Sequence, residues 1–271
     1  MGHSLSPLIQ NTALDHLGLR LVYLAANVEE DKVESAVRGL ASVGALGANI
    51  TVPYKELAFH LCDVVSERAR AIGACNVLKF AGGEIHGDNT DGAGWLRGLD
   101  QELGGELPSK ALVLGAGGAA RAVVYSLARR KVPEIVVFNR TLERAKALAT
   151  DFLAYALTRT YAAAMDELEH HLLPGCLVVQ TTSAGLEDDS SPVSLPDDWP
   201  DGAILSELIY GRETPLAAAV RAKGGTVYDG LPMLVYQAAE GLSIWLDRPL
   251  SEIPAELMLA TARRHLAARL T

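Results

Sequence analysis

The chain has 271 residues, of which 49% are hydrophobic and 21% charged, a composition typical of folded proteins and not of disordered ones. At about 150 residues per domain, this length predicts two domains. The formal net charge of −9 argues against binding to nucleic acid or to a membrane surface by charge alone. The three cysteines are too few for a disulfide framework, and none forms a CxxC pair that would indicate a structural zinc.

The start of the chain lacks the charged and apolar regions of a secretory signal. Residues 1–6, MGHSLS, match the myristoylation pattern, but no polybasic patch follows them. The most apolar stretch, residues 111–127, is interrupted by glycines and an arginine, so it does not predict a membrane span. We therefore expect a cytoplasmic protein, either a monomer or a homodimer, that binds neither membrane nor nucleic acid.

Helical and strand patterns alternate along the first part of the chain. Ser6 is expected to cap a helix that has Pro7 in its first turn and ends at Gly18. The further elements expected here are strands at 20–26 and 48–52, helices at 30–43, 54–62, 67–72 and 90–103, and a hairpin of 76–80 with 84–86.

A second unit is expected to begin after Pro108. Its expected strands are 110–114, 135–138, 177–181, 203–207 and 226–228, with a helix from the glycine run at 115 to Arg130 and others at 142–152 and 215–223. Two helices, 231–245 and 254–270, close the chain, and residues 187–201 are typical of an exposed loop. This alternation predicts an α/β protein with two parallel-sheet units.

A glycine-rich run between a predicted strand and a predicted helix indicates a nucleotide site. In Gly115-x-Gly117-x-x-Ala120, the glycines allow a tight turn and a close approach of backbone to a pyrophosphate, which helix N–H groups then bind. The expected phosphate-binding residues are Gly115, Ala116, Gly117, Gly118 and Ala119. A plain glycine turn is the alternative, but the strand–turn–helix setting favours the nucleotide.

The residues after the next strand favour NADP over NAD. NAD enzymes place an acidic residue there for the ribose hydroxyl, whereas this chain has Asn139, Arg140 and Thr141, with Arg144 one helical turn later. Two arginines can hold a 2′-phosphate with charge-assisted hydrogen bonds. The alternative is a solvated helix start, although cations are unfavourable at a helix N-terminus.

Polar clusters occur at 3–7, 49–55, 73–76 and 87–92, where predicted strands end. Each cluster alone is ordinary, but their hydroxyl, amide, amine and carboxylate groups together suit a small polyhydroxylated acid. With GAGGAA and NRTLERA, the runs HSLSP, NITVPYKE, GACN and GDNTDG resemble the shikimate dehydrogenase family over nearly the whole chain. The resemblance implies reduction of 3-dehydroshikimate to shikimate with NADPH, on the route to chorismate and the aromatic amino acids. It also implies an α/β substrate domain of residues 1–91 plus 236–271 around an inserted Rossmann-type NADP-binding domain of residues 92–235.

The resemblance also implies roles for single residues. Lys55 and Asp91 would be the catalytic pair, because an ammonium can stabilise and protonate the oxygen of a ketone that receives a hydride. Residues implied to bind substrate are Ser4, Ser6, Thr51, Lys55, Asn76, Asp91, Tyr210 and Gln237, and Gly230 and Met233 would join the cofactor site. No metal is expected, and His170 with His171 is interpreted as helix surface.

The chain departs from the family pattern in a few places. Gln180 and Glu207 stand where Asn and Asp are frequent, which we interpret as minor changes. In the family a first strand precedes HSLSP, but only two residues precede His3 here, so we expect a gap between strands 20–26 and 48–52 and a native start further upstream. An NAD-dependent quinate/shikimate dehydrogenase and a non-catalytic NADP-binding module remain as alternatives.

Overall fold

The structure is a computed structural model that describes residues 4–154 and 158–269. The chain forms two compact units, Met1–Gly94 with Leu234–Thr271 and Trp95–Met233. It passes from one to the other within helix α5 (Asp91–Leu103) and returns within helix α10 (Leu231–Leu246).

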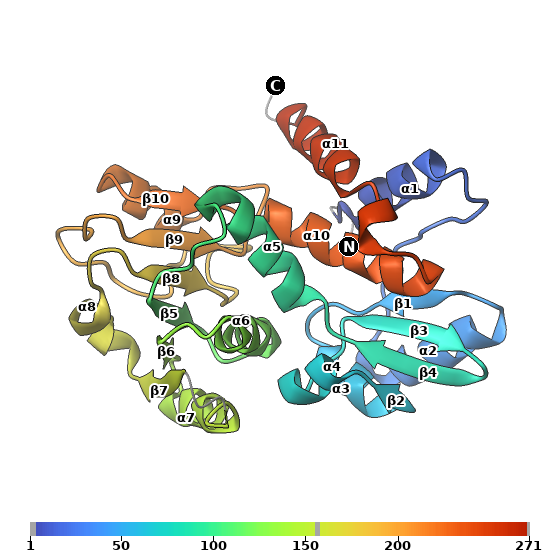
Figure 1. Cartoon of the computed structure of the whole chain (residues 1–271), viewed down its shortest axis with the longest axis horizontal. Coiled ribbons are helices and arrows are strands. Elements are labelled where there is room, and N and C mark those ends of the chain that lie inside the picture. The colour runs from blue at the N-terminus through green and yellow to red at the C-terminus, as the bar shows by residue number, and fades with distance from the viewer. Residues whose placement is uncertain (1–3, 155–157, 270–271) are drawn as a thin grey trace. The chain divides into compact units, whose positions relative to one another are not determined.

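The first unit contains a four-stranded sheet of order β1-β3-β4-β2 (Figure 1). Its strands are β1 (Gly47–Asn49), β2 (Val64–Val65), β3 (Val77–Ala81) and β4 (Glu84–Asp88). Its helical segments, besides parts of α5 and α10, are α1 (Ser6–His16), η1 (Glu30–Lys32), α2 (Val33–Ser42), α3 (Lys55–Leu61), α4 (Glu67–Ile72), η3 (Leu250–Glu252) and α11 (Ala255–Ala267). The predicted hairpin is confirmed, and its turn needs glycine because Gly82 and Gly83 have φ of 62° and 85°.

Helices cover both faces of this sheet. Leu78 packs with Val37 of α2 and Ala58 of α3 in one buried cluster. On the other face α10 approaches closely, since a side chain at Gly241 would meet Val77 at 3.3 Å. The alternation of adjacent β3 residues between two buried faces is the period-2 pattern of a strand.

The prediction of a parallel sheet in this unit is wrong. β1 and β4 both pair with β3 in antiparallel fashion, and only β2 with β4 is parallel. The hairpin of β3 and β4 fixes this direction locally, whereas parallel pairing needs a longer crossover between partners.

The predicted strand at 20–26 is also wrong, and β1 ends at Asn49 instead of residue 52. Val22 and Leu24 are 70% and 75% exposed, and the backbone of Tyr23 pairs with the side chain of Asn11 instead of a strand. An extended segment becomes a strand only beside a hydrogen-bonded neighbour, and the described residues place none there. Residues 20–26 and β1 line one apolar groove of about 830 Å³ together with Trp245, and the expected gap between two strands stays a prediction, because residues 20–26 form no strand.

The second unit contains a six-stranded sheet of order β10-β9-β8-β5-β6-β7, in which every pair is parallel (Figure 1). Its strands are β5 (Lys110–Leu114), β6 (Glu134–Phe138), β7 (Arg159–Ala163), β8 (Leu177–Gln180), β9 (Ile204–Glu207) and β10 (Thr226–Tyr228). Its helical segments are α6 (Gly118–Arg129), α7 (Leu142–Asp151), η2 (Met165–Glu167), α8 (Leu168–His171) and α9 (Pro215–Ala222). The predicted parallel sheet is confirmed in this unit, although β7 was not predicted.

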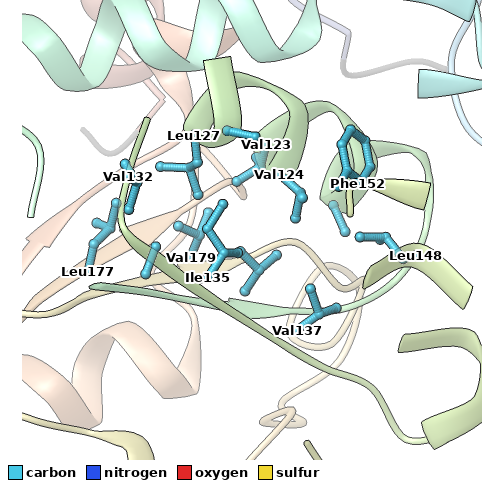
Figure 2. Packing of buried hydrophobic residues seen from close by; sticks show 14 of the residues in the cluster. Val123, Val124, Leu127, Val132, Ile135, Val137, Leu148, Phe152, Leu177 and Val179 are labelled. Atoms are coloured by element: carbon cyan, nitrogen blue, oxygen red, sulfur yellow. The ribbon is translucent and has the colours of Figure 1, made fainter. Parts of the chain in front are cut away.

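The core of the second unit lies on both faces of its sheet. Along β5, Ala111 and Val113 join one cluster, while Leu112 and Leu114 join the other. Figure 2 shows the first cluster, where α6 packs Val123, Val124 and Leu127 against Ile135, Val137, Leu177 and Val179. Because both faces are covered, the strands are apolar throughout, which is why the sequence shows runs of apolar residues here.

Candidate active site

A lysine and an aspartate form a short ion pair in the first unit. Lys55 begins α3 and Asp91 begins α5, and Lys55 Nζ lies 2.6 Å from Asp91 Oδ2. The Asp91 side chain is 4% exposed and that of Lys55 16% exposed. The pair is therefore shielded from bulk water, which strengthens its attraction.

Asn76 holds the second oxygen of Asp91. Its Nδ2 donates to Asp91 Oδ1 at 2.9 Å and also lies within hydrogen-bond distance of Thr90 and Gln237 oxygens. Its Oδ1 accepts the backbone N–H of Thr90 at 2.8 Å. Asn76 is 2% exposed, so each of these bonds replaces hydration that the amide cannot regain. The carboxylate is consequently fixed on both sides.

The return of the chain brings Gln237 of α10 to this cluster. Thr90 Oγ1 donates to the Gln237 carbonyl at 2.9 Å. A Cβ at Gly94 would lie 2.3 Å from the Gln237 nitrogen, so only glycine in α5 permits this approach. Thr90 and Gly94 were not among the predicted site residues. The Asn-Thr-Asp run was visible in the sequence, but the partner of Thr90 lies 147 residues away.

The predicted hydroxyl residues lie in the same unit. Ser4 Oγ accepts the backbone N–H of Ser6 at 3.3 Å, and both serines are half-buried, whereas Thr51 is exposed. Ser6 is the first residue of α1 and not its cap; Leu5 precedes the helix and offers no side-chain oxygen. Within the described ranges no hydrogen bond joins these three hydroxyls to the Lys55–Asp91 pair, and their part in substrate binding stays a prediction.

The second unit has the geometry of a phosphate loop after β5. Gly115 has φ of 118°, and a Cβ there would lie 2.5 Å from Thr181 Oγ1. Gly117 precedes α6 without a capping side chain, and a Cβ there would meet nothing within 4 Å. The first turn of α6, with Gly118 and Ala119, thus presents backbone N–H groups to open space, as pyrophosphate binding requires.

Two arginines lie where β6 meets α7. Arg140 and Arg144 are exposed, and over residues 4–154 and 158–269 neither forms an ion pair. Asn139 Nδ2 donates to the Thr141 carbonyl at 2.9 Å, which holds the turn between them. Although Glu143 also lies in this first turn, two arginines without an ion-pair partner among the described residues favour an anionic ligand at this helix N-terminus, as predicted for a phosphate on the ribose.

Gln180 and Glu207 brace the loops that follow β8 and β9. Gln180 Oε1 accepts the Thr182 N–H at 3.0 Å. Glu207 accepts from the Ile209 N–H and from Thr214 Oγ1, and burial raises the pKa of its carboxyl. These loops lie at the carboxyl edge of the parallel strands, where open α/β sheets bind ligands. No local sequence pattern indicated this supporting role.

The other predicted residues of the second unit surround the same strands. Tyr210 follows β9, and burial raises the pKa of its phenol. Gly230 leaves no room for a side chain, because a Cβ would lie 1.9 Å from the Leu208 carbonyl oxygen. Met233 packs against the core cluster of Figure 2. His171 is half-buried and stacks edge-on against Phe138, so it is not simply helix surface.

Among the described residues, no three or more His, Cys, Asp or Glu side chains form a cluster suited to a metal ion. No helix in the same part of the chain is long and apolar enough to cross a membrane.

Comparison with known proteins supports the motif resemblance. Residues 1–78 match the shikimate dehydrogenase substrate binding domain, and residues 100–186 match the shikimate/quinate 5-dehydrogenase family. Shikimate dehydrogenase (NADP(+)) of Methanopyrus kandleri is 39% identical over 97% of this chain and 92% of that protein. Shikimate 5-dehydrogenase of Thermus thermophilus, solved with NADP(H) and shikimate, has a TM-score of 0.83 and 34% identity over 97% of this chain and 95% of that one.

A protein with another named activity shares the fold. The 5-ketofructose reductase of a Gluconobacter strain has a TM-score of 0.80 and 27% identity over 97% of this chain and 94% of that one. The level of identity to the shikimate dehydrogenases over nearly their whole length decides the assignment: this chain belongs to the shikimate dehydrogenase family.

Proposed function

We propose that this protein reduces 3-dehydroshikimate to shikimate with NADPH, as a step towards chorismate and the aromatic amino acids. The observation that carries the proposal is the shielded Lys55–Asp91 pair, held by Asn76, in the unit that matches a substrate binding domain. NADPH, when bound at the glycine turn after β5 with Arg140 and Arg144 at its 2′-phosphate, supplies the hydride. The proposal includes a cytoplasmic location, which the three free thiols fit.

In this proposal Lys55 handles the proton. A ketone oxygen gains negative charge as its carbon is reduced, and an ammonium within hydrogen-bond distance stabilises that charge and donates the proton. Asp91 aims Nζ through the 2.6 Å contact. Asn76 fixes Asp91 in turn, so the direction of Nζ depends on a buried polar network and not on a flexible side chain alone.

The remaining polar groups would bind the substrate. Hydroxyls of Ser4 and Ser6 suit a carboxylate, and the amide of Gln237 and the hydroxyl of Thr51 suit ring hydroxyls. Tyr210 belongs to the other unit, and its part in substrate binding stays a prediction. None of these groups distinguishes shikimate from quinate by chemistry alone, so the substrate test must include both.

The decisive variant is Lys55→Ala. We expect its kcat to fall by about 10²–10⁴-fold, the usual contribution of a positioned acid–base group, while shikimate affinity by calorimetry changes little. The matched control is Lys32→Ala, whose side chain is 64% exposed and pairs with the adjacent Asp31. Assays should offer 3-dehydroshikimate, shikimate, quinate and 5-ketofructose, each with both nicotinamide cofactors.

A Lys55→Ala enzyme that keeps kcat within about threefold of the parent would contradict the catalytic role. Faster turnover of quinate with NAD than of shikimate with NADP would replace the proposal by the quinate enzyme. Cofactor binding without turnover of any of these substrates would replace it by a non-catalytic NADP-binding module.

A further inference from the structure

Two of the three cysteines lie side by side in the first unit. The sulfur atoms of Cys62 and Cys75 are 3.9 Å apart, and the structure holds both as free thiols. Cys62 follows the last residue of α3 and is half-buried, while Cys75 is 0% exposed. Cys62 is therefore the more exposed residue of the pair, and we expect a reagent from solvent to meet it first.

Gly87 of β4 creates the space that the two sulfurs share. A Cβ at this position would lie 2.4 Å from Cys62 Sγ and 2.6 Å from Cys75 Sγ. Both sulfurs thus rest over the same point of one strand, and no side chain separates them. A disulfide requires them to close from 3.9 Å to about 2.05 Å, a shift within the reach of side-chain rotation and small backbone movement.

The electrostatics of the pair assign different roles to the two thiols. Hydrogen bonding to Cys75 lowers the pKa of Cys62, against opposing effects of burial and Asp63. The same hydrogen bond, burial and the charge of Asp88 raise the pKa of Cys75. The more exposed thiol is hence the better nucleophile, and the buried one retains the proton.

We propose that Cys62 and Cys75 form a reversible disulfide that modifies the active site. Cys75 lies between the two halves of that site: its backbone N–H donates to the Lys55 carbonyl at 2.9 Å, and Asn76 is its neighbour in the chain. Closing the sulfurs displaces the end of α3 or the segment around Cys75. Either movement changes the register between Lys55 and the amide that holds Asp91.

The oxidant is a small-molecule disulfide such as oxidised glutathione. The Cys62 thiolate attacks one of its sulfurs, forming a mixed disulfide and releasing the first glutathione thiolate, which takes up a proton. Cys75 then loses its proton, attacks Cys62 Sγ and releases the second glutathione. Two protein thiols are oxidised and one glutathione disulfide is reduced to two thiols, so electrons and atoms balance.

The test uses the full chain, reduced and then equilibrated with oxidised glutathione under native conditions. We expect the intact mass to fall by that of two hydrogen atoms, and digestion to yield a peptide that joins Cys62 to Cys75. Cys176, which is 2% exposed in the other unit, serves as the internal control and stays a thiol. We also expect faster hydrogen exchange at the Cys75 amide, because its bond to the Lys55 carbonyl is disturbed.

The effect on turnover rests on the proposed function. We expect kcat for shikimate to fall by about 10- to 100-fold on oxidation, as displacements near 1 Å do in active sites, and to recover with dithiothreitol. Cys62→Ser should keep its turnover in the oxidant, and Cys176→Ser should respond as the parent does. Because Cys75→Ser changes a buried position, the Cys62→Ser variant carries the comparison.

Absence of the Cys62–Cys75 peptide, or a stable glutathione adduct on Cys62 in its place, would overturn the inference. Cross-linking with unchanged exchange at Cys75 and unchanged turnover would overturn its effect on the site. A reduced enzyme without activity on 3-dehydroshikimate would refute the proposed function alone, because peptide mapping and hydrogen exchange still decide the disulfide.

Discussion

Replacing Arg68 by methionine should destabilise the first unit by about 3 kcal/mol. The Arg68 guanidinium joins α4 to β4 and to α10 by hydrogen bonds of 2.6 and 2.9 Å to Asp88 and 2.9 Å to Glu240. The three side chains are 16–26% exposed. Removing one member of a buried ion pair costs about 3–5 kcal/mol, and we take the lower end because water reaches part of this cluster.

The loss of stability in Arg68→Met should depend on pH. Burial opposes ionisation of Asp88, but hydrogen bonds and charge from Arg68, with the Ser66 hydroxyl and the Asn89 N–H, hold its pKa below the usual value. A lowered pKa stabilises the folded state above the unfolded carboxyl pKa of about 3.9 and ceases to do so as pH falls through the folded value. Without the cation, burial raises the Asp88 pKa. The gap between parent and Arg68→Met should thus be largest near neutral pH and shrink below about pH 4.

A two-unit protein needs a probe specific to the first unit, because its global unfolding need not be two-state. Trp245 is that probe: it is buried and donates to the Leu78 carbonyl at 2.8 Å, while Trp95 and Trp199 belong to the second unit. Denaturant titrations in a Trp95→Phe/Trp199→Phe background would report on Trp245 alone. The control is Arg70→Met, an exposed position on the same helix. A difference below about 1 kcal/mol between Arg68→Met and Arg70→Met at pH 7 would refute the argument.

Three further predictions concern other parts of the chain. The double variant Arg140→Ala/Arg144→Ala should lower NADPH affinity by at least about tenfold and narrow the preference for NADPH over NADH. The control Arg129→Ala should change neither. Equal kinetics with both cofactors in the parent would contradict binding of the 2′-phosphate by Arg140 and Arg144. Val22→Ser and Leu24→Ser should each change the free energy of unfolding by less than about 0.5 kcal/mol, because both side chains are exposed. A loss of stability above about 1.5 kcal/mol in the Trp245 titration would show that these side chains are buried in solution. Gly87→Ala should lower the free energy of unfolding by about 1–3 kcal/mol, because the added methyl group overpacks against Cys62 and Cys75. Gly39→Ala is the control and should not destabilise the protein, because a Cβ there would meet nothing within 4 Å. Equal stability of the two variants would mean that the sulfurs move aside freely.

Elements with a complete local signal could be predicted from the sequence. Strand β5 and helix α4 begin and end at the predicted residues. In β5 a short apolar run precedes glycines, and in α4 Ser66 accepts the Ala69 N–H at the start while Gly73 ends the helix with φ of 75°. Such caps and turns act within a few residues, so the sequence contains them in full.

Elements that depend on a distant partner could not be predicted from the sequence. Residues 20–26 have strand-forming side chains but no neighbouring strand among the described residues, whereas β7 has an unremarkable sequence and forms because β6 pairs with it. The site shows the same division. Lys55 and Asp91 were named from motifs, but the convergence of Thr90 and Gln237 on Asn76 joins residues 14 and 161 positions apart. The cysteine pair was missed because its spacing matches no metal or redox motif, and only the fold brings the sulfurs together over Gly87.

Helix α10, which returns to the first unit from the end of the chain, holds part of the candidate active site in place. Gln237 contacts both Asn76 and Thr90, and Trp245, two turns further along α10, donates to the Leu78 carbonyl. Asn76 and Leu78 belong to the same segment at the start of β3, so one helix from the end of the chain fixes both the sheet and the amide that holds Asp91. These bonds are buried, and each left unmade would cost about 1–3 kcal/mol. The geometry of the Lys55–Asp91 pair is therefore a property of the closed first unit, set when α10 docks, and not of the first 94 residues alone.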